Sequence, residues 1–89
     1  GSGLNFNVVA KKLRELNLSF TEKADDNGTF FAGITKEKIA AELIKQGLEL
    51  KSKQIELSEP IKKEGEFTIE VNVGVGIKSQ LKIKTIKAK

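Results

Sequence analysis

Asp25 and Asp26 stand side by side in the sequence. Adjacent carboxylates are candidates for chemistry because they can share a proton or bind a divalent cation. Both lie in a short polar run, Lys23–Gly28, which ends in Asn-Gly, a dipeptide typical of tight turns. The run lacks the alternating oxygen ligands of a calcium-binding loop. A turn is therefore the favoured interpretation, with catalysis or metal binding as the alternative.

The chain has no histidine and no cysteine. General acid–base catalysis near neutral pH mostly uses histidine, and thiolate chemistry or Cys-based zinc binding requires cysteine. Every aspartate and glutamate lies in a polar sequence context. We therefore predict that the protein is not an enzyme and that it uses no cofactor, no metal ion and no small-molecule substrate.

Gly74-Val75-Gly76 matches half of a nucleotide-binding glycine motif. The rest of the motif is absent, and the sequence that follows does not predict a helix. Two glycines in this position favour a hairpin loop between two strands, which we expect to span residues 74–79.

Positive charge is the remaining candidate for function. The net charge is +4, and Arg14 is the single arginine among 16 basic residues. Lysine attracts phosphate without the bidentate geometry that arginine provides. The final segment, residues 71–89, has five lysines and no acid. This asymmetry is compatible with contact to a polyanion such as RNA, and equally with a well-solvated lysine surface.

Two groups of lysines are the candidates for contact with RNA phosphates: Lys78, Lys82 and Lys84 near the C-terminus, and Lys36 and Lys38 at the start of a predicted helix. Helix N-termini attract phosphate, which favours the second group. Phe30 and the adjacent Phe31 could stack on RNA bases, although two neighbouring aromatic residues more often fill a core. We keep Phe30 as an RNA-binding candidate, with core packing as the alternative.

The elements that position these residues follow from hydrophobic periodicity. Residues 8–16 and 35–46 have apolar residues at helical spacing, and Thr35 is a suitable N-cap for the second helix. Residues 18–21, 66–73 and 81–85 alternate between apolar and polar side chains, as strands do. Phe30, Phe31 and Ile34 are expected to enter the core from a loop.

These elements predict an α+β fold. We expect a small mixed three-stranded sheet with one long and one or two short helices, ending in an antiparallel hairpin. A chain of 89 residues is the length of one domain. No apolar run reaches the roughly 18 residues of a membrane span, so no membrane contact is expected. Gly1-Ser2-Gly3 is interpreted as a cloning remnant, so we expect the natural chain to be longer.

The stretch from Ala24 to Ile86 resembles the C-terminal domain of bacterial large-subunit ribosomal protein L-nine. The resemblance lies in the following segments: Asn27–Phe31, Ile34–Ala40, Gln46-Gly47, Lys53–Leu57, Glu59–Lys62, Gly65-Glu66 and the hairpin Val71–Lys84. It implies a structural, non-catalytic parent protein, cytoplasmic and ribosome-associated, whose N-terminal domain binds ribosomal RNA. By this resemblance, residues 4–17 end a connecting helix and residues 18–89 form the single C-terminal domain.

The sequence departs from the family pattern at three places. The family usually has lysine where this chain has Thr29, serine where it has Gly33, and a His-Pro-Glu loop where it has Gly74-Val75-Gly76. Two functions therefore stay open. The first is weak, electrostatic association with ribosomal RNA through lysines, and the second is a protein-interaction or spacer domain that touches ribosomal neighbours but no RNA. In either case we expect the isolated domain to be a monomer.

Overall fold

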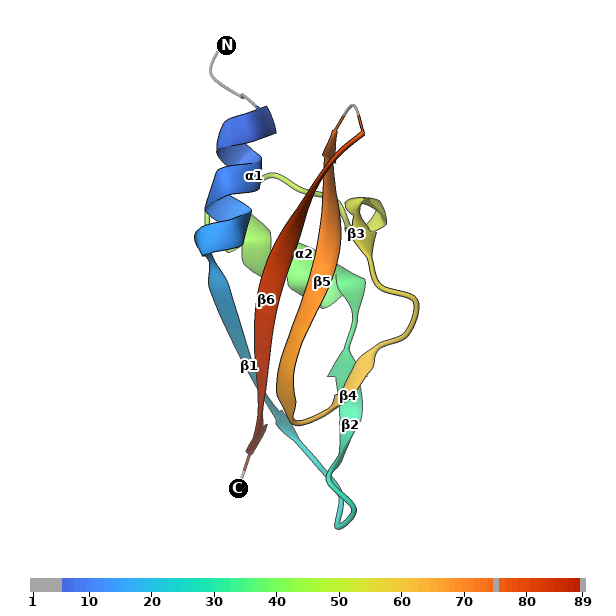
Figure 1. Ribbon diagram of the computed structural model, residues 1–89. Helices are drawn as coiled ribbons and strands as arrows, with labels where there is room; N and C mark the ends of the chain where they lie inside the picture. Colours follow the sequence, from blue (N-terminus) through green and yellow to red (C-terminus); the bar gives the residue numbers. More distant parts are fainter. Residues whose placement is uncertain (1–5, 75, 89) are drawn as a thin grey trace.

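The computed structural model describes residues 6–74 and 76–88 of the chain. The interpreted cloning remnant, residues 1–3, and Val75 of the predicted hairpin loop lie outside these residues. In chain order, the described elements are α1 (Phe6–Glu15), β1 (Asn17–Lys23), β2 (Thr29–Ile34), α2 (Lys36–Lys45), the 3-10 helix η1 (Ser52–Gln54), β3 (Ile55–Glu56), β4 (Ile61–Lys63), β5 (Gly65–Gly74) and β6 (Ile77–Ala88) (Figure 1).

The strands form two sheets. A four-stranded mixed sheet has the order β1-β6-β5-β3, with β1 parallel to β6 and the other neighbours antiparallel, and β2 pairs with β4 in a separate two-stranded sheet. The predicted three-stranded sheet is therefore wrong. The missed strands show no clear alternation: β3 and β4 have two and three residues, and the register of β2 against β4 is shifted by an irregularity. Consequently Phe30, Phe31 and Ile34 lie in strand β2 and not in a loop.

The two α-helices have ten residues each, so the predicted long helix is also wrong. The predicted helix 35–46 corresponds to α2, which is one residue shorter at each end. Thr35 caps α2 because its side-chain oxygen accepts a hydrogen bond of 3.3 Å from the backbone N–H of Lys38. None of the helices in the described ranges has the length and apolar character needed to cross a membrane.

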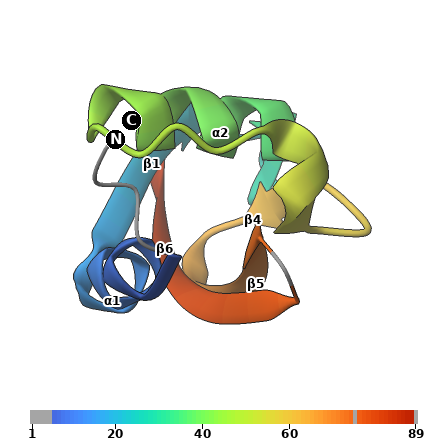
Figure 2. The same ribbon diagram turned by 90° about the horizontal axis from the view of Figure 1, so that it is seen from above.

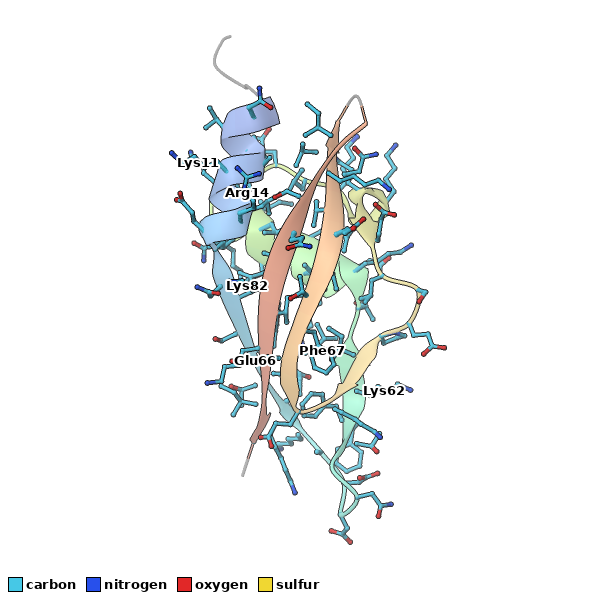
Figure 3. The ribbon with its side chains drawn as sticks, in the orientation of Figure 1. Lys11, Arg14, Lys62, Glu66, Phe67 and Lys82 are labelled. Atoms are coloured by element: carbon cyan, nitrogen blue, oxygen red, sulfur yellow. The ribbon has the colours of Figure 1, made fainter. Side chains whose placement is uncertain are left out.

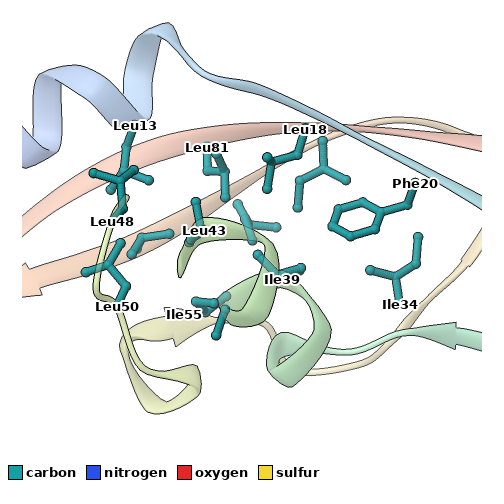
Figure 4. Packing of buried hydrophobic residues seen from close by; sticks show 14 of the residues in the cluster. Leu13, Leu18, Phe20, Ile34, Ile39, Leu43, Leu48, Leu50, Ile55 and Leu81 are labelled. Carbon is teal, nitrogen blue, oxygen red and sulfur yellow. The ribbon is translucent and has the colours of Figure 1, made fainter. Parts of the chain in front are cut away.

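One face of the four-stranded sheet carries the core. α2 packs across this face, while α1 lies along β6 next to the start of β1 (Figure 2). Leu13 from α1, Leu43 from α2 and Leu81 from β6 belong to the same buried cluster (Figure 4). α1 is therefore part of the domain core.

The opposite face of the four-stranded sheet is exposed and is called the open face below. β5 and β6 form the predicted antiparallel hairpin, but the predicted loop 74–79 is too long, because β6 begins at Ile77 and Lys78 and Ser79 are paired with β5. Side chains of β6 alternate strictly from residue 78 to residue 85, with even-numbered residues exposed on the open face and odd-numbered residues buried. The buried hydroxyls on the inner side are satisfied, since Ser79 donates a hydrogen bond of 2.7 Å to the backbone oxygen of Ala10 and Thr85 donates one of 2.7 Å to that of Lys63.

Candidate nucleic-acid interface

The three C-terminal lysines lie together on the open face. Lys78, Lys82 and Lys84 are exposed residues of β6 at even-numbered positions, so the pleat directs them to the same side. This placement follows from the buried odd-numbered positions of β6, because a shift of one residue would turn all three lysines into the core.

Acidic side chains from β5 and β3 share this face. In the register of β5 against β6, Glu66 lies opposite Lys84 and Glu70 lies opposite Gln80. Lys78 forms a salt bridge of 3.0 Å with Glu56 on β3. The hydrogen bond and the charge of Glu56 raise the pKa of Lys78 above its ordinary value. Lys78 therefore already has a partner and is less available to a phosphate.

Lys82 and Lys84 differ from Lys78 in this respect. Within the described residues, neither one forms a salt bridge. In the strand register, Lys82 lies between Asn17 on β1 and Thr68 on β5. Lys84 lies between Ser19 on β1 and Glu66 on β5. Lysine ammonium groups without a bound carboxylate are the cations that can contact an incoming anion.

A shallow hollow of about 580 Å³ lies on the open face at this point. Figure 3 shows Lys82, Glu66 and Phe67 on the strands that form it. The polar side chains that line the hollow come from three strands: Asn17 and Ser19 from β1, Glu66 and Thr68 from β5, and Lys82 and Lys84 from β6. The hollow therefore combines two cations, one carboxylate and three neutral hydrogen-bonding groups.

The second predicted group of lysines lies on the other side of the domain. Lys36 is exposed in the first turn of α2, while Lys38 is paired with Glu22 of β1. α2 lies behind the sheet, on the side away from the open face (Figures 1 and 2). The two groups of lysines are not brought together, so one flat partner cannot contact both at once.

Phe30 and Phe31 have opposite environments. Phe30 is 1% exposed and belongs to the core, whereas Phe31 is 72% exposed. The ring of Phe30 is therefore not accessible to a nucleic-acid base in this structure, and base stacking by Phe30 is not supported. In strand β2, Phe30 and Phe31 point to opposite sides, a distinction that adjacency in the sequence does not reveal.

The acidic pair forms a turn. A side-chain oxygen of Asp25 accepts hydrogen bonds of 2.9 Å from the backbone N–H groups of Asn27 and Thr29. This is the local bonding expected of an aspartate in a turn. The described ranges have no group of three or more acidic side chains that could hold a metal ion.

Comparison with known proteins identifies the family. Residues 5–87 match the sequence profile described as "Ribosomal protein L9, C-terminal domain". The chain belongs to the ribosomal protein L9 C-terminal domain family. Its members are structural ribosomal proteins and not enzymes. The resemblance expected from the motifs between Ala24 and Ile86 is confirmed, and the match also covers α1 and β1.

Several curated relatives carry the name "Large ribosomal subunit protein bL9". The protein from Wolinella succinogenes is 43% identical over 76 residues, which are 84% of this chain and 51% of that protein. The relative from Nitratiruptor is 40% identical over 75 residues, or 84% of this chain and 51% of the relative. The one from Helicobacter hepaticus is 39% identical over 80 residues, or 90% of this chain and 54% of the relative. The chain thus spans about half the length of the curated relatives it matches.

In this L9 domain, Arg14 is a basic residue beside the candidate interface that was not among the predicted RNA-binding residues. Arg14, at the end of α1, lines a second small hollow with Glu70, Lys78 and Gln80 beside the open face (Figure 3). Because Arg14 is the single arginine of the chain, its residue type could have marked it as a candidate for anion contact. Its position next to β6, however, depends on the packing of α1. The contribution of Asn17 and Ser19 was also missed, because the parallel pairing of β1 with β6 joins distant parts of the chain.

Proposed function

We propose that this chain is the C-terminal domain of a structural protein of the large ribosomal subunit, located with the ribosome in the cytoplasm. In this proposal the domain contacts ribosomal RNA weakly, through lysine side chains. The family assignment and the bL9 relatives support the ribosomal part. The net charge of +4 supports the contact with a polyanion.

We further propose that α1 (Phe6–Glu15), within the expected span 4–17, is the end of a connecting helix and packs into the core of the domain formed by residues 18–89. We also propose that the isolated domain is monomeric. The last turns of that helix are held rigidly, because Ala10 and Leu13 of α1 lie in the core. The hydrogen bond from Ser79 to the backbone of Ala10 adds a polar contact between α1 and β6. A helix anchored in this way would transmit its direction to the domain.

The observation that carries the RNA proposal is the pair Lys82 and Lys84 on the open face. Both are exposed, both lie at the same hollow, and neither is engaged in a salt bridge within the described residues. When exposed lysines neutralise phosphates, the counterions condensed on the nucleic acid are released, and this release drives binding.

The test measures the affinity of the 89-residue chain for a labelled large-subunit ribosomal RNA transcript at several salt concentrations, by fluorescence anisotropy. Lys82→Ala plus Lys84→Ala should weaken binding, and the slope of log K against log salt should become shallower by about 1.4 to 1.8 units. The control, Lys12→Ala plus Lys45→Ala, removes the same charge away from the open face. An affinity that does not respond to salt, or an equal loss in both double variants, would contradict the proposal.

A spacer or protein-interaction domain is the second candidate. The carboxylates on the open face favour it, since Glu56 already binds Lys78 and Glu66 and Glu70 repel phosphate. In that case the isolated chain would recover a ribosomal protein and no RNA from nuclease-treated ribosomes. Recovery of protected RNA fragments with the chain would exclude this candidate.

A further inference from the structure

The hollow on the open face contains an acceptor group that phosphate binding alone does not explain. Glu66 lies directly opposite Lys84 and lines the same hollow as Lys82. A site that only attracted phosphates would gain from the absence of this carboxylate, because like charges repel. As the opposite charge in register with Lys84, Glu66 favours the pairing of β5 with β6, and towards a ligand it offers only acceptor oxygens.

The spacing of the hollow fits a strand of sugar and phosphate groups. Lys82 and Lys84 are two residues apart on β6, so their Cα atoms are separated by about 6.6–6.8 Å. This is comparable to the distance between successive phosphates along a nucleic-acid strand. Side chains directly opposite on neighbouring strands have Cβ atoms about 4.5–5.5 Å apart. The Cβ atoms of Glu66 and Lys84 are therefore separated by about the width of a ribose.

We propose that the hollow binds the sugar–phosphate backbone of an RNA strand and selects RNA over DNA. Lys82 and Lys84 contact successive phosphates, and the carboxylate of Glu66 accepts a hydrogen bond from the ribose 2′-hydroxyl between them. Ser19 and Thr68 flank the two lysines in the strand register and supply neutral donors to the phosphate oxygens. This inference rests on the proposed contact with RNA and adds the backbone chemistry that is recognised.

The 2′-hydroxyl is the group that distinguishes the RNA backbone from DNA, and it can donate a hydrogen bond that a deoxyribose cannot. A carboxylate is an acceptor without donors, so it matches this hydroxyl and repels a phosphate. Its place on β5, directly opposite Lys84, puts this acceptor at the side of the two lysines. Base identity plays no part in this recognition, because phosphate and sugar contacts carry no sequence information.

The test compares oligouridylate and oligodeoxyuridylate of about 12 nucleotides, a length within the site sizes of single-strand binding folds. Affinities for the 89-residue chain are measured by fluorescence anisotropy at low salt. The unaltered chain should prefer RNA about three- to tenfold, the effect of one hydrogen bond at an exposed site.

Two substitutions separate the charge of Glu66 from its hydrogen bond. Glu66→Gln keeps an acceptor oxygen and removes the repulsion, so affinity for both oligonucleotides should rise about threefold with the RNA preference intact. Glu66→Leu removes the charge and the acceptor, so affinity for DNA should rise and the RNA preference should disappear. As matched controls, Glu49→Gln and Glu49→Leu change an exposed acid beyond α2 and should leave the preference unchanged.

The outcomes also distinguish this inference from the proposed function. If the chain binds ribosomal RNA but shows no preference for oligouridylate, or if Glu66→Leu retains the preference, the ribose contact is refuted and the lysine contact stands. If neither oligonucleotide nor the ribosomal transcript binds at low salt, both proposals are refuted. Circular dichroism of each variant should match that of the unaltered chain, because residue 66 is exposed.

Discussion

Leu13→Ala tests whether α1 belongs to the folded domain or merely leads into it. Leu13 is 0% exposed and is one of the largest fully buried side chains. The substitution removes about three methyl or methylene groups from the core, which corresponds to about 2.4 kcal/mol of transfer free energy. The cavity that remains adds to this loss, so we expect the free energy of unfolding to fall by about 3–4 kcal/mol.

The assay is urea denaturation followed by circular dichroism, with thermal unfolding as a second measure. For a domain of this size, 1 kcal/mol shifts Tm by about 4–8 °C, so the expected decrease in Tm is above 10 °C. Val8→Ala is the matched control on the same helix, because Val8 is 46% exposed, and it should cost less than about 1 kcal/mol.

A loss below about 1 kcal/mol for Leu13→Ala would refute the reasoning, because it would mean that α1 can leave the sheet without disturbing the core. It would also weaken the proposal that the connecting helix is rigidly anchored. A large loss for Val8→Ala as well would show that burial does not distinguish the two positions, because alanine favours the helix at both.

Two further predictions concern the backbone and the ion pairs. Gly33 has a φ of +71°, and an added Cβ would lie 3.3 Å from Cγ of Lys62. We therefore expect Gly33→Ala to destabilise the domain by about 2 kcal/mol in urea, and more than Gly28→Ala, where φ is also positive but no atom lies within 4 Å. Glu56→Gln should return the pKa of Lys78 towards its ordinary value, as measured by NMR titration of the lysine side chains. Because this pKa is raised in the folded state, the contribution of the pair to stability is present below the ordinary lysine range. It is lost as the pH rises through the raised pKa, so stability in Glu56→Gln should depend less on pH there.

Much of the fold could be predicted from local patterns. The alternation in β5 and β6 predicted the hairpin and the exposure of Lys82 and Lys84, because a strand's side-chain period of two shows directly in its sequence. The apolar stripe and the N-cap Thr35 predicted α2 to within one residue at each end. In contrast, β3 and β4 were missed because segments this short do not show a period.

The candidate site was only partly predictable. The lysines were found from composition and spacing, but their partners were not. Lys78 is bound to Glu56 of β3, and Lys38 to Glu22 of β1, through contacts between residues 22 and 16 positions apart. No local pattern predicts such pairs, because they depend on which strands become neighbours and in which register.

The sequence by itself determined which chemistry is available to this protein. Without histidine or cysteine, and with one arginine among 16 basic residues, the composition favours lysine-mediated contact with anions over catalysis. The sequence also determined which residues of β6 face water. When the apolar side chains of a strand are buried on one face of the sheet, the alternate side chains lie on the opposite face.

Only the tertiary structure decided which of these residues can act together. It buried Phe30 and exposed Phe31, and it set Glu66 opposite Lys84 on the open face. It also joined β1 to the edge of β6, which added Ser19 to the hollow. The physical reason is that strand pairing and register are chosen by the burial of the whole core, to which residues distant in the sequence contribute jointly.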